Sequence, residues 1–258
     1  MNNVSSRKVA LGAAGLFMAV LAWYLIALGP MRESPLPAPA QVFSAMIAMV
    51  QDLAFWESLG ITMLMAAKGF AWALLVGVLL GMAVGWFGLV GKALSFVVEF
   101  LKPIPPIVIM PLAILVLGPT QRMGEFLVFY GCLLPILYQT AAGVRETDPV
   151  AIQTSRSYGV GTGEILGRVV LPSASAFIAT AIRTAIPISL IVSVVAGLLG
   201  GGPGLGSEIQ RALSANETAD LYGLVLILGA VGLLLQLLSG GIESKVLSWH
   251  PSYRKLVH

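Results

Sequence analysis

The sequence predicts an all-α protein that crosses a membrane several times. Of its 258 residues, 57% are hydrophobic and only 10% are charged, and the mean hydropathy is +0.91. Soluble domains average about 45–50% apolar and about 25% charged residues. Apolar runs of about 20 residues, long enough to span a bilayer as helices, recur along the chain. One polar segment, 145–172, interrupts them with six charged residues, so it is expected to lie outside the lipid.

Six spans are expected from the apolar runs and the breaks between them. The first run follows Arg7 and Lys8 and has no small-residue cleavage site before Pro30, so we expect an uncleaved helix rather than a signal peptide. A proline-rich stretch from Pro35 and an amphipathic helix at about 40–56, placed along the outer interface, come next. The spans are predicted at about 9–29, 61–88, 93–117, 124–144, 174–199 and 221–242.

Polar and helix-breaking residues inside the spans need an explanation. Gly77, Gly81 and Gly85 have four-residue spacing, which favours close packing against another helix over a pathway. Three prolines within four residues break the third span, and both a simple kink and a pathway lining fit them. Arg183 could attract anions, or it could be held by backbone carbonyls or reach the membrane surface. The pathway candidates are Pro103, Pro105, Pro106, Gln139, Arg183, Ser189 and Ser193.

The distribution of lysine and arginine predicts that both termini face the cytoplasm. Cytoplasmic loops of membrane proteins carry an excess of these residues. With six spans and the N-terminus inside, nine of them fall on the inner side and three on the outer side, which also puts the polar segment inside. The inner set is Arg7, Lys8, Lys92, Arg145, Arg156, Arg168, Lys245, Arg254 and Lys255, and the outer set is Arg32, Arg122 and Arg211.

The polar segment is predicted to fold as two short helices joined by a glycine turn. Asp148 is a good N-cap and Pro149 suits the first helical position. Gly159 can end this helix with a positive φ. Thr162 offers a second N-cap, and Glu164 in the first turn favours the helix dipole. An apolar stripe on the second helix needs a surface to pack against, for which a partner protein is the natural candidate. It consists of Ile165, Leu166, Val169 and Val170.

In this segment the chain resembles the permease subunits of bacterial ABC importers that work with a binding protein. The cytoplasmic signature of that family combines a Glu-Ala-Ala triplet, a glycine and a later Leu-Pro pair. The triplet position here reads Gln153-Thr154-Ser155, which keeps small residues but lacks the acid. The resemblance extends over nearly the whole chain and is greatest to the nitrate, taurine and alkanesulfonate permeases. The residues in register are Asp148, Pro149, Arg156, Gly159, Arg168, Leu171 and Pro172.

The resemblance implies a type I importer permease fold in the bacterial inner membrane, surrounded by lipid. It implies a homodimer, two cytoplasmic ATPase subunits and an extracytoplasmic solute-binding protein. It also implies an arginine at the place of Arg183 whatever the substrate, which favours a structural role there. Gly159→Asp is then expected to uncouple transport without removing the protein from the membrane. The ATPase-docking residues would be Asp148, Gln153, Ser155, Arg156, Tyr158, Gly159, Gly161, Glu164, Leu171 and Pro172.

Several other activities are not supported. The chain has no Gly-x-x-x-x-Gly-Lys-Ser/Thr phosphate loop, so ATP and magnesium would bind the partner ATPase, and the chain would be a transport subunit rather than an enzyme. No catalytic set, metal site, cofactor or nucleic-acid ligand is expected, and Cys132 is the single cysteine. An ion-coupled transporter would need acids within its spans, where only Glu99 and Glu125 are near. A membrane scaffold is a further alternative. The cargo could be a small anion, such as a sulfonate, taurine or nitrate, or a vitamin precursor such as a pyrimidine or flavin.

Overall fold

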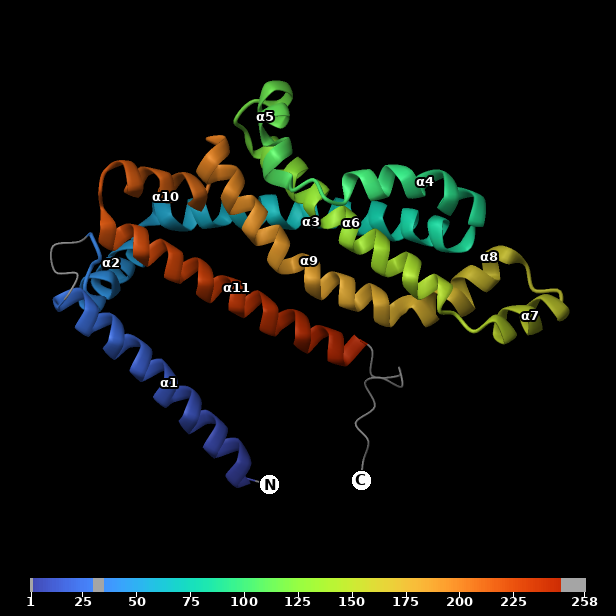
Figure 1. The fold of residues 1–258 in the computed structure, drawn as a ribbon, viewed down its shortest axis with the longest axis horizontal. Coiled ribbons are helices and arrows are strands. Elements are labelled where there is room, and N and C mark those ends of the chain that lie inside the picture. Colours follow the sequence, from blue (N-terminus) through green and yellow to red (C-terminus); the bar gives the residue numbers. More distant parts are fainter. Residues whose placement is uncertain (1, 30–34, 247–258) are drawn as a thin grey trace. The chain divides into compact units, whose positions relative to one another are not determined.

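The computed structural model describes residues 2–29 and 35–246, and all regular structure in these ranges is helical (Figure 1). The predicted all-α class is therefore confirmed. Arg32, Arg254 and Lys255 of the sequence analysis lie outside the described residues. The elements are α1 (Asn2–Leu28), α2 (Pro39–Gln51), α3 (Leu53–Trp86), α4 (Gly88–Leu101), α5 (Pro106–Leu117), α6 (Gln121–Arg145), α7 (Pro149–Ser157), α8 (Thr162–Ile165), the π-helical turn η1 (Leu166–Val170), α9 (Leu171–Gly200), α10 (Leu205–Ser214) and α11 (Thr218–Val246).

The number of membrane-crossing helices agrees with the sequence. Among the described residues, five helical stretches are long and apolar enough to cross a membrane, and α4 with α5 would add a sixth as one broken span. These two helices meet at 91°, so the third predicted span is not a straight helix. Proline explains the bend, because Pro105 caps α5 and Pro106 begins it.

The amphipathic helix expected at 40–56 is shorter than predicted. α2 ends at Gln51, and Asp52 adopts an extended conformation with φ −88° and ψ 130°. The Asp52 carboxylate then accepts a hydrogen bond of 3.0 Å from the backbone N–H of Ala54 and starts α3 as an N-cap would. Residues 53–56, predicted to belong to the amphipathic helix, form the first turn of α3.

The described chain forms two compact units. The first contains the N-terminal part as far as Glu57 together with Glu208–Gly229, and Trp23 stacks on Tyr222 within it with ring centroids 6.5 Å apart. The second contains Ser58–Ser207 and the chain after Gly229. The polar segment and the pathway candidates all lie in the second unit.

The core of the second unit is built from α3, α6 and α9. Its fully buried residues are small or branched, so the helices can approach closely. The predicted packing role of the glycine row in α3 is confirmed, because each glycine lies against a side chain of α6: Gly77 on Ile136, Gly81 on Thr140 and Gly85 on Val144. The central cluster comprises Ala73, Val128, Cys132, Ile136, Ala181 and Ala185.

Candidate functional site

α7 begins and ends as the sequence predicts. The Asp148 carboxylate accepts a hydrogen bond of 2.8 Å from the backbone N–H of Val150, and Pro149 occupies the first turn. At the other end Gly159 has a φ of +76°. Its N–H donates to the carbonyl of Arg156 at 2.9 Å, and the N–H of Val160 donates to the carbonyl of Ser155 at 3.1 Å. This pair of bonds is a Schellman cap, which satisfies carbonyls that the helix end would leave free.

The second predicted helix of the polar segment is not a separate element. Its N-cap is Gly161 rather than Thr162, and no side chain caps it. α8 continues through the π-helical turn η1 into α9, so Pro172 lies in the first turn of α9 and interrupts nothing. Proline has no backbone N–H and cannot donate the usual hydrogen bond to the preceding turn. A π turn adds one residue to the helix just before Pro172, which lets the helix continue without that bond. Helical structure therefore runs from Thr162 to Gly200 and includes the whole of the fifth span predicted at 174–199.

The apolar stripe of α8 and η1 is buried by the chain itself, so the expectation that it awaits a partner protein is wrong. Ile165 is 1% exposed and Val170 is fully buried. Both pack in one cluster with Val144 of α6 and Ala174 of α9, and Trp86 of α3 is partly buried against it. Leu166 and Val169 also belong to this cluster. The stripe anchors the polar segment to the core of the unit.

The surface that remains open belongs to α7 and the glycine turn. Tyr158 is 84% exposed and Val150 is 65% exposed, although both carry large apolar groups. The guanidinium of Arg156 lies 5.6 Å from the ring centroid of Trp86, which ties α7 to the end of α3. Ser155 is half-buried, and the other predicted docking residues are exposed, namely Asp148, Gln153, Arg156, Tyr158, Gly159, Gly161, Glu164, Leu171 and Pro172. Their role in docking stays a prediction.

The proline break between α4 and α5 is held by a tyrosine that the sequence analysis did not single out. The hydroxyl of Tyr130 in α6 lies 3.1 Å from the carbonyl of Leu101 and 3.3 Å from that of Ile104, and it donates to this pair. The Leu101 carbonyl also accepts a hydrogen bond of 3.1 Å from the backbone N–H of Ile104. Both carbonyls lie where the helix is interrupted, so the tyrosine hydroxyl adds a partner for them inside a span. Pro103 and Pro105 are exposed next to them.

The two serine candidates for the pathway are structural. Ser189 is 5% exposed and Ser193 is 1% exposed. Each hydroxyl donates to a backbone carbonyl of its own helix, that of Ile186 at 2.7 Å and that of Leu190 at 2.8 Å. Gln139 is half-buried. The serines therefore do not present their hydroxyls to a pathway.

Each of the three cations in the spans has a partner on another helix. Arg183 lies 3.6 Å from the carboxylate of Glu243, which is 8% exposed, so a carboxylate holds Arg183 where we had considered carbonyls. Lys68 forms an ion pair of 3.2 Å with Glu125. Lys102 lies 4.9 Å from the ring centroid of Tyr138. Glu243 was missed because the sixth span was expected to end one residue earlier, and the sequence shows no link between positions 183 and 243.

The arrangement of helices and the polar segment can be compared with known proteins. Residues 73–244, two thirds of the chain, match the family model described as binding-protein-dependent transport system inner membrane component. The chain belongs to this family. The permease is 25% identical to the taurine transport system permease of Escherichia coli over 95% of its own length and 91% of that protein. It is 31% identical to the bicarbonate transport permease of Synechococcus elongatus over 70% of its length and 65% of that protein.

Solved structures of ABC transporters share the fold. The permease superposes on a chain of an inward-facing methionine ABC transporter with a TM-score of 0.61, at 22% identity, over 75% of its length and 94% of that chain. It superposes on a chain of an amino acid ABC transporter solved with histidines with a TM-score of 0.62, at 18% identity, over 78% of its length and 96% of that chain. The importer permease fold expected from the sequence is confirmed.

Membership of the family decides between the functions considered for the sequence. The protein is the membrane-spanning permease subunit of an ABC importer rather than an ion-coupled transporter or a scaffold. It is a transport subunit and not an enzyme, because ATP hydrolysis in such importers resides in a separate subunit. Permeases of this family work with an ATPase and a binding protein, and the chain is a multi-pass membrane protein.

Proposed function

We propose that α7 is the element that docks on the ATPase subunit. It projects large exposed side chains, Val150 and Tyr158, from a helix fixed at both ends by the Asp148 cap and the Gly159 turn. A short helix with an apolar surface fits a hydrophobic groove in a partner. ATP and magnesium would bind the ATPase subunits, and the closure of their pair would carry α7 along.

The helix that follows α7 offers a mechanism for coupling. α8, η1 and α9 form one uninterrupted helical stretch, and its first turns are buried against α3 and α6. A displacement of the docked loop would therefore reach the fifth span without being absorbed in a flexible joint. The two permease halves would rock between inward-open and outward-open states. What drives the change is the difference in binding free energy of the ATPase for these two states.

We infer that the working permease is a homodimer with two ATPase subunits and an extracytoplasmic solute-binding protein, with both termini in the bacterial cytoplasm. The excess of lysine and arginine on the inner side supports this orientation. α9 supports the dimer through Arg183, which is exposed on a membrane span beside Thr180 and Thr184. The threonine hydroxyls donate to carbonyls of their own helix, so Arg183 is the group that is costly against lipid. A second copy that faces α9 across an aqueous pathway would keep Arg183 away from lipid.

We propose that a small anion is the cargo. Three relatives are named as permeases for taurine, nitrate and bicarbonate, all of which carry an anionic group. The side chain of Arg183 is 55% exposed, although one of its nitrogens lies near Glu243. It is therefore open to an anion that moves along this face of α9.

Docking through α7 predicts a strong effect of a charge at its most exposed apolar position. Tyr158→Glu should lower co-purification with the ATPase subunits by about 30-fold, because an apolar anchor at a protein interface contributes about 2 kcal/mol or more. Tyr158→Phe, which keeps the ring, should co-purify as the wild type does. A Tyr158→Glu permease that still retains its ATPase at the wild-type level would exclude this docking surface.

Variants of the Arg183–Glu243 pair can distinguish a role of Arg183 in attracting the anionic cargo from a purely structural role. Arg183→Gln alone removes the positive charge beside a nearly buried carboxylate and should reduce the amount of folded protein. The double variant Arg183→Gln/Glu243→Gln removes both charges at similar volume and should fold normally. If Arg183 attracts the cargo, uptake of labelled taurine or nitrate, whichever the complex carries, should remain about tenfold lower in the double variant. Restoration of uptake by the second substitution would make the pair purely structural.

A further inference from the structure

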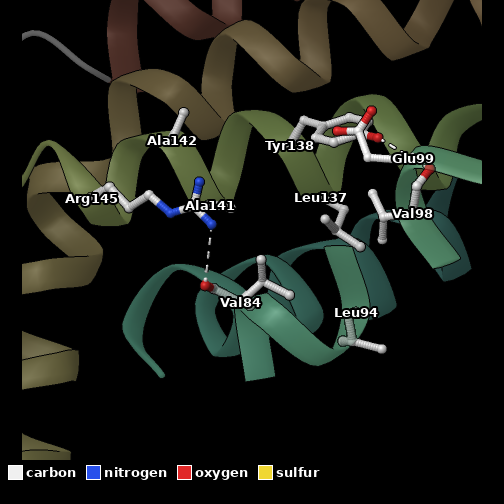
Figure 2. A pocket seen from close by; sticks show the side chains of 10 residues that line it. Val84, Leu94, Val98, Glu99, Leu137, Tyr138, Ala141, Ala142 and Arg145 are labelled. Carbon is white, nitrogen blue, oxygen red and sulfur yellow. Dashed lines mark hydrogen bonds between the residues drawn. The ribbon is translucent and has the colours of Figure 1, made fainter. Parts of the chain in front are cut away.

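A cavity of about 310 Å³ lies between the end of α3, helix α4 and the last turns of α6 (Figure 2). Its walls are largely apolar and include Val84, Leu94 and Leu137. Two opposite charges also line it, the guanidinium of Arg145 and the carboxylate of Glu99, and Figure 2 shows them toward opposite ends. The cavity is separate from the polar face of α9 and from the loop proposed to dock.

Both charged side chains are exposed, and neither has an ion-pair partner within the described part of the chain. Arg145 makes one long hydrogen bond, 3.5 Å from its Nη2 to the carbonyl of Val84. Among the described residues, Glu99 has no hydrogen-bond or ion-pair partner. The Tyr138 hydroxyl beside Glu99 donates to the carbonyl of Val98 at 3.3 Å, so it is already used as a donor. A ligand with opposite charges at its two ends could therefore pair with both side chains through charge-assisted hydrogen bonds.

The spacing of the two charges limits the size of such a ligand. Glu99 lies beside Tyr138, and Tyr138 and Arg145 are seven residues apart on α6, which corresponds to about 10 Å along the helix. The cavity therefore has room for a short molecule with an opposite charge at each end. An ammonium and an oxyanion joined by a chain of two carbons fit these limits. The methylene groups of this chain would lie against the apolar wall.

We propose that this cavity binds a small zwitterion whose primary ammonium pairs with Glu99 and whose sulfonate, carboxylate or phosphate group pairs with Arg145. The same aminoethyl chemistry occurs in a free amino-sulfonate and in the headgroup of an aminoethyl phospholipid. A ligand in the cavity would bridge α4 and α6. The proposal concerns binding to the permease itself, so it holds whichever solute the complex transports.

The test uses the full permease, purified with its ATPase subunits in detergent, and equilibrium binding of radiolabelled taurine. Isethionate, which has the same sulfonate but a hydroxyl in place of the ammonium, should compete about tenfold more weakly than unlabelled taurine, because it cannot form the charged bond to Glu99. Ethylammonium, which lacks the anion, should also compete weakly. Equal competition by taurine and isethionate would overturn the role of Glu99.

Variants locate the site. Glu99→Gln should make taurine bind as weakly as isethionate, and Arg145→Gln should weaken both. Ala142→Leu should exclude both ligands by filling the cavity without a change of charge. Glu57→Gln and Arg122→Gln remove exposed charges that do not line the cavity, and they should bind taurine as the wild type does. Taurine binding that is unchanged in Glu99→Gln would refute the proposal.

A lipid arm identifies the source of the ligand. Phosphatidylethanolamine and phosphatidylglycerol are added separately to the detergent micelles during the taurine assay. One outcome is that phosphatidylethanolamine displaces taurine from the wild type and phosphatidylglycerol does not, with no such displacement in Glu99→Gln. This result would support the aminoethyl chemistry and identify the lipid headgroup as a ligand of the same cavity. Displacement by both lipids equally would contradict the need for an ammonium, because phosphatidylglycerol has none.

Discussion

Replacing Gly159 by valine is expected to abolish coupled uptake while the permease remains folded in the membrane. Gly159 has a φ of +76°, and a β-carbon there would meet no atom within 4 Å. The demand on this position is therefore conformational and not a matter of space. A β-branched residue is a rare outlier at positive φ, and the left-handed conformation costs an ordinary residue about 1–2 kcal/mol. The chain can relieve this cost by changing the turn, which would change the direction of α7 relative to α8.

The measurement is uptake by cells that contain the whole transporter, together with the amount of permease in the membrane. Gly159→Val should lower uptake at least about tenfold at an unchanged amount of protein, because the Schellman cap that orients α7 would be lost. Gly159→Asn is the matched control, since asparagine tolerates the left-handed region, and it should retain most of the uptake. Gly159→Asp is a weaker test for the same reason. Gly163→Val, at a glycine with open space and ordinary φ, should also be tolerated.

Normal uptake by the Gly159→Val permease would show that the orientation of α7 does not matter for coupling. Loss of uptake in the Gly159→Asn variant as well would show that any side chain at this position is harmful, whatever backbone conformation it allows. The two variants therefore separate the conformational explanation from a direct contact between Gly159 and the ATPase.

The parts of the fold that the sequence predicted well are those set by local chemistry. The Asp148 cap and the Gly159 turn each depend on residues within a few positions, so their residue types are enough to identify them. The spans follow from length and hydropathy alone. The proline break before α5 is also local, because Pro105 and Pro106 act on their own backbone.

The parts that could not be predicted depend on residues far away in the chain. The stripe with Ile165 looked unpartnered because its partners, Trp86 and Val144, come from two other helices. The same holds for Arg183, whose carboxylate partner Glu243 is 60 positions later in the numbering. A local pattern reports that a face is apolar or that a charge needs a partner, but it does not say which segment supplies the partner. Only the packing of α3, α6, α9 and α11 decides this.

Replacing Gly81 by valine is expected to prevent most of the permease from folding, because Gly81 lies where α3 packs closely against α6. A β-carbon at Gly81 would lie 2.6 Å from Cβ of Thr140 and 2.7 Å from the backbone carbonyl of Leu137. A carbonyl within a helix cannot rotate away, so the two helices would have to separate along the interface that forms the core of the unit. Overpacking of a core costs about 1–3 kcal/mol, and a clash with backbone lies at or above the upper end of this range.

The amount of permease in the membrane and its thermal unfolding in detergent measure this effect. Gly81→Val should reduce the folded protein several-fold, and Gly81→Ala should cause a smaller loss because it adds a single methyl group. Gly60→Val is the matched control on the same helix, since a β-carbon there would meet no atom within 4 Å. If Gly81→Val accumulated and unfolded as the wild type does, the close contact of α3 with α6 would not exist in the membrane. The buried anchor of the α8 stripe, which rests on the same two helices, would then lose its support as well.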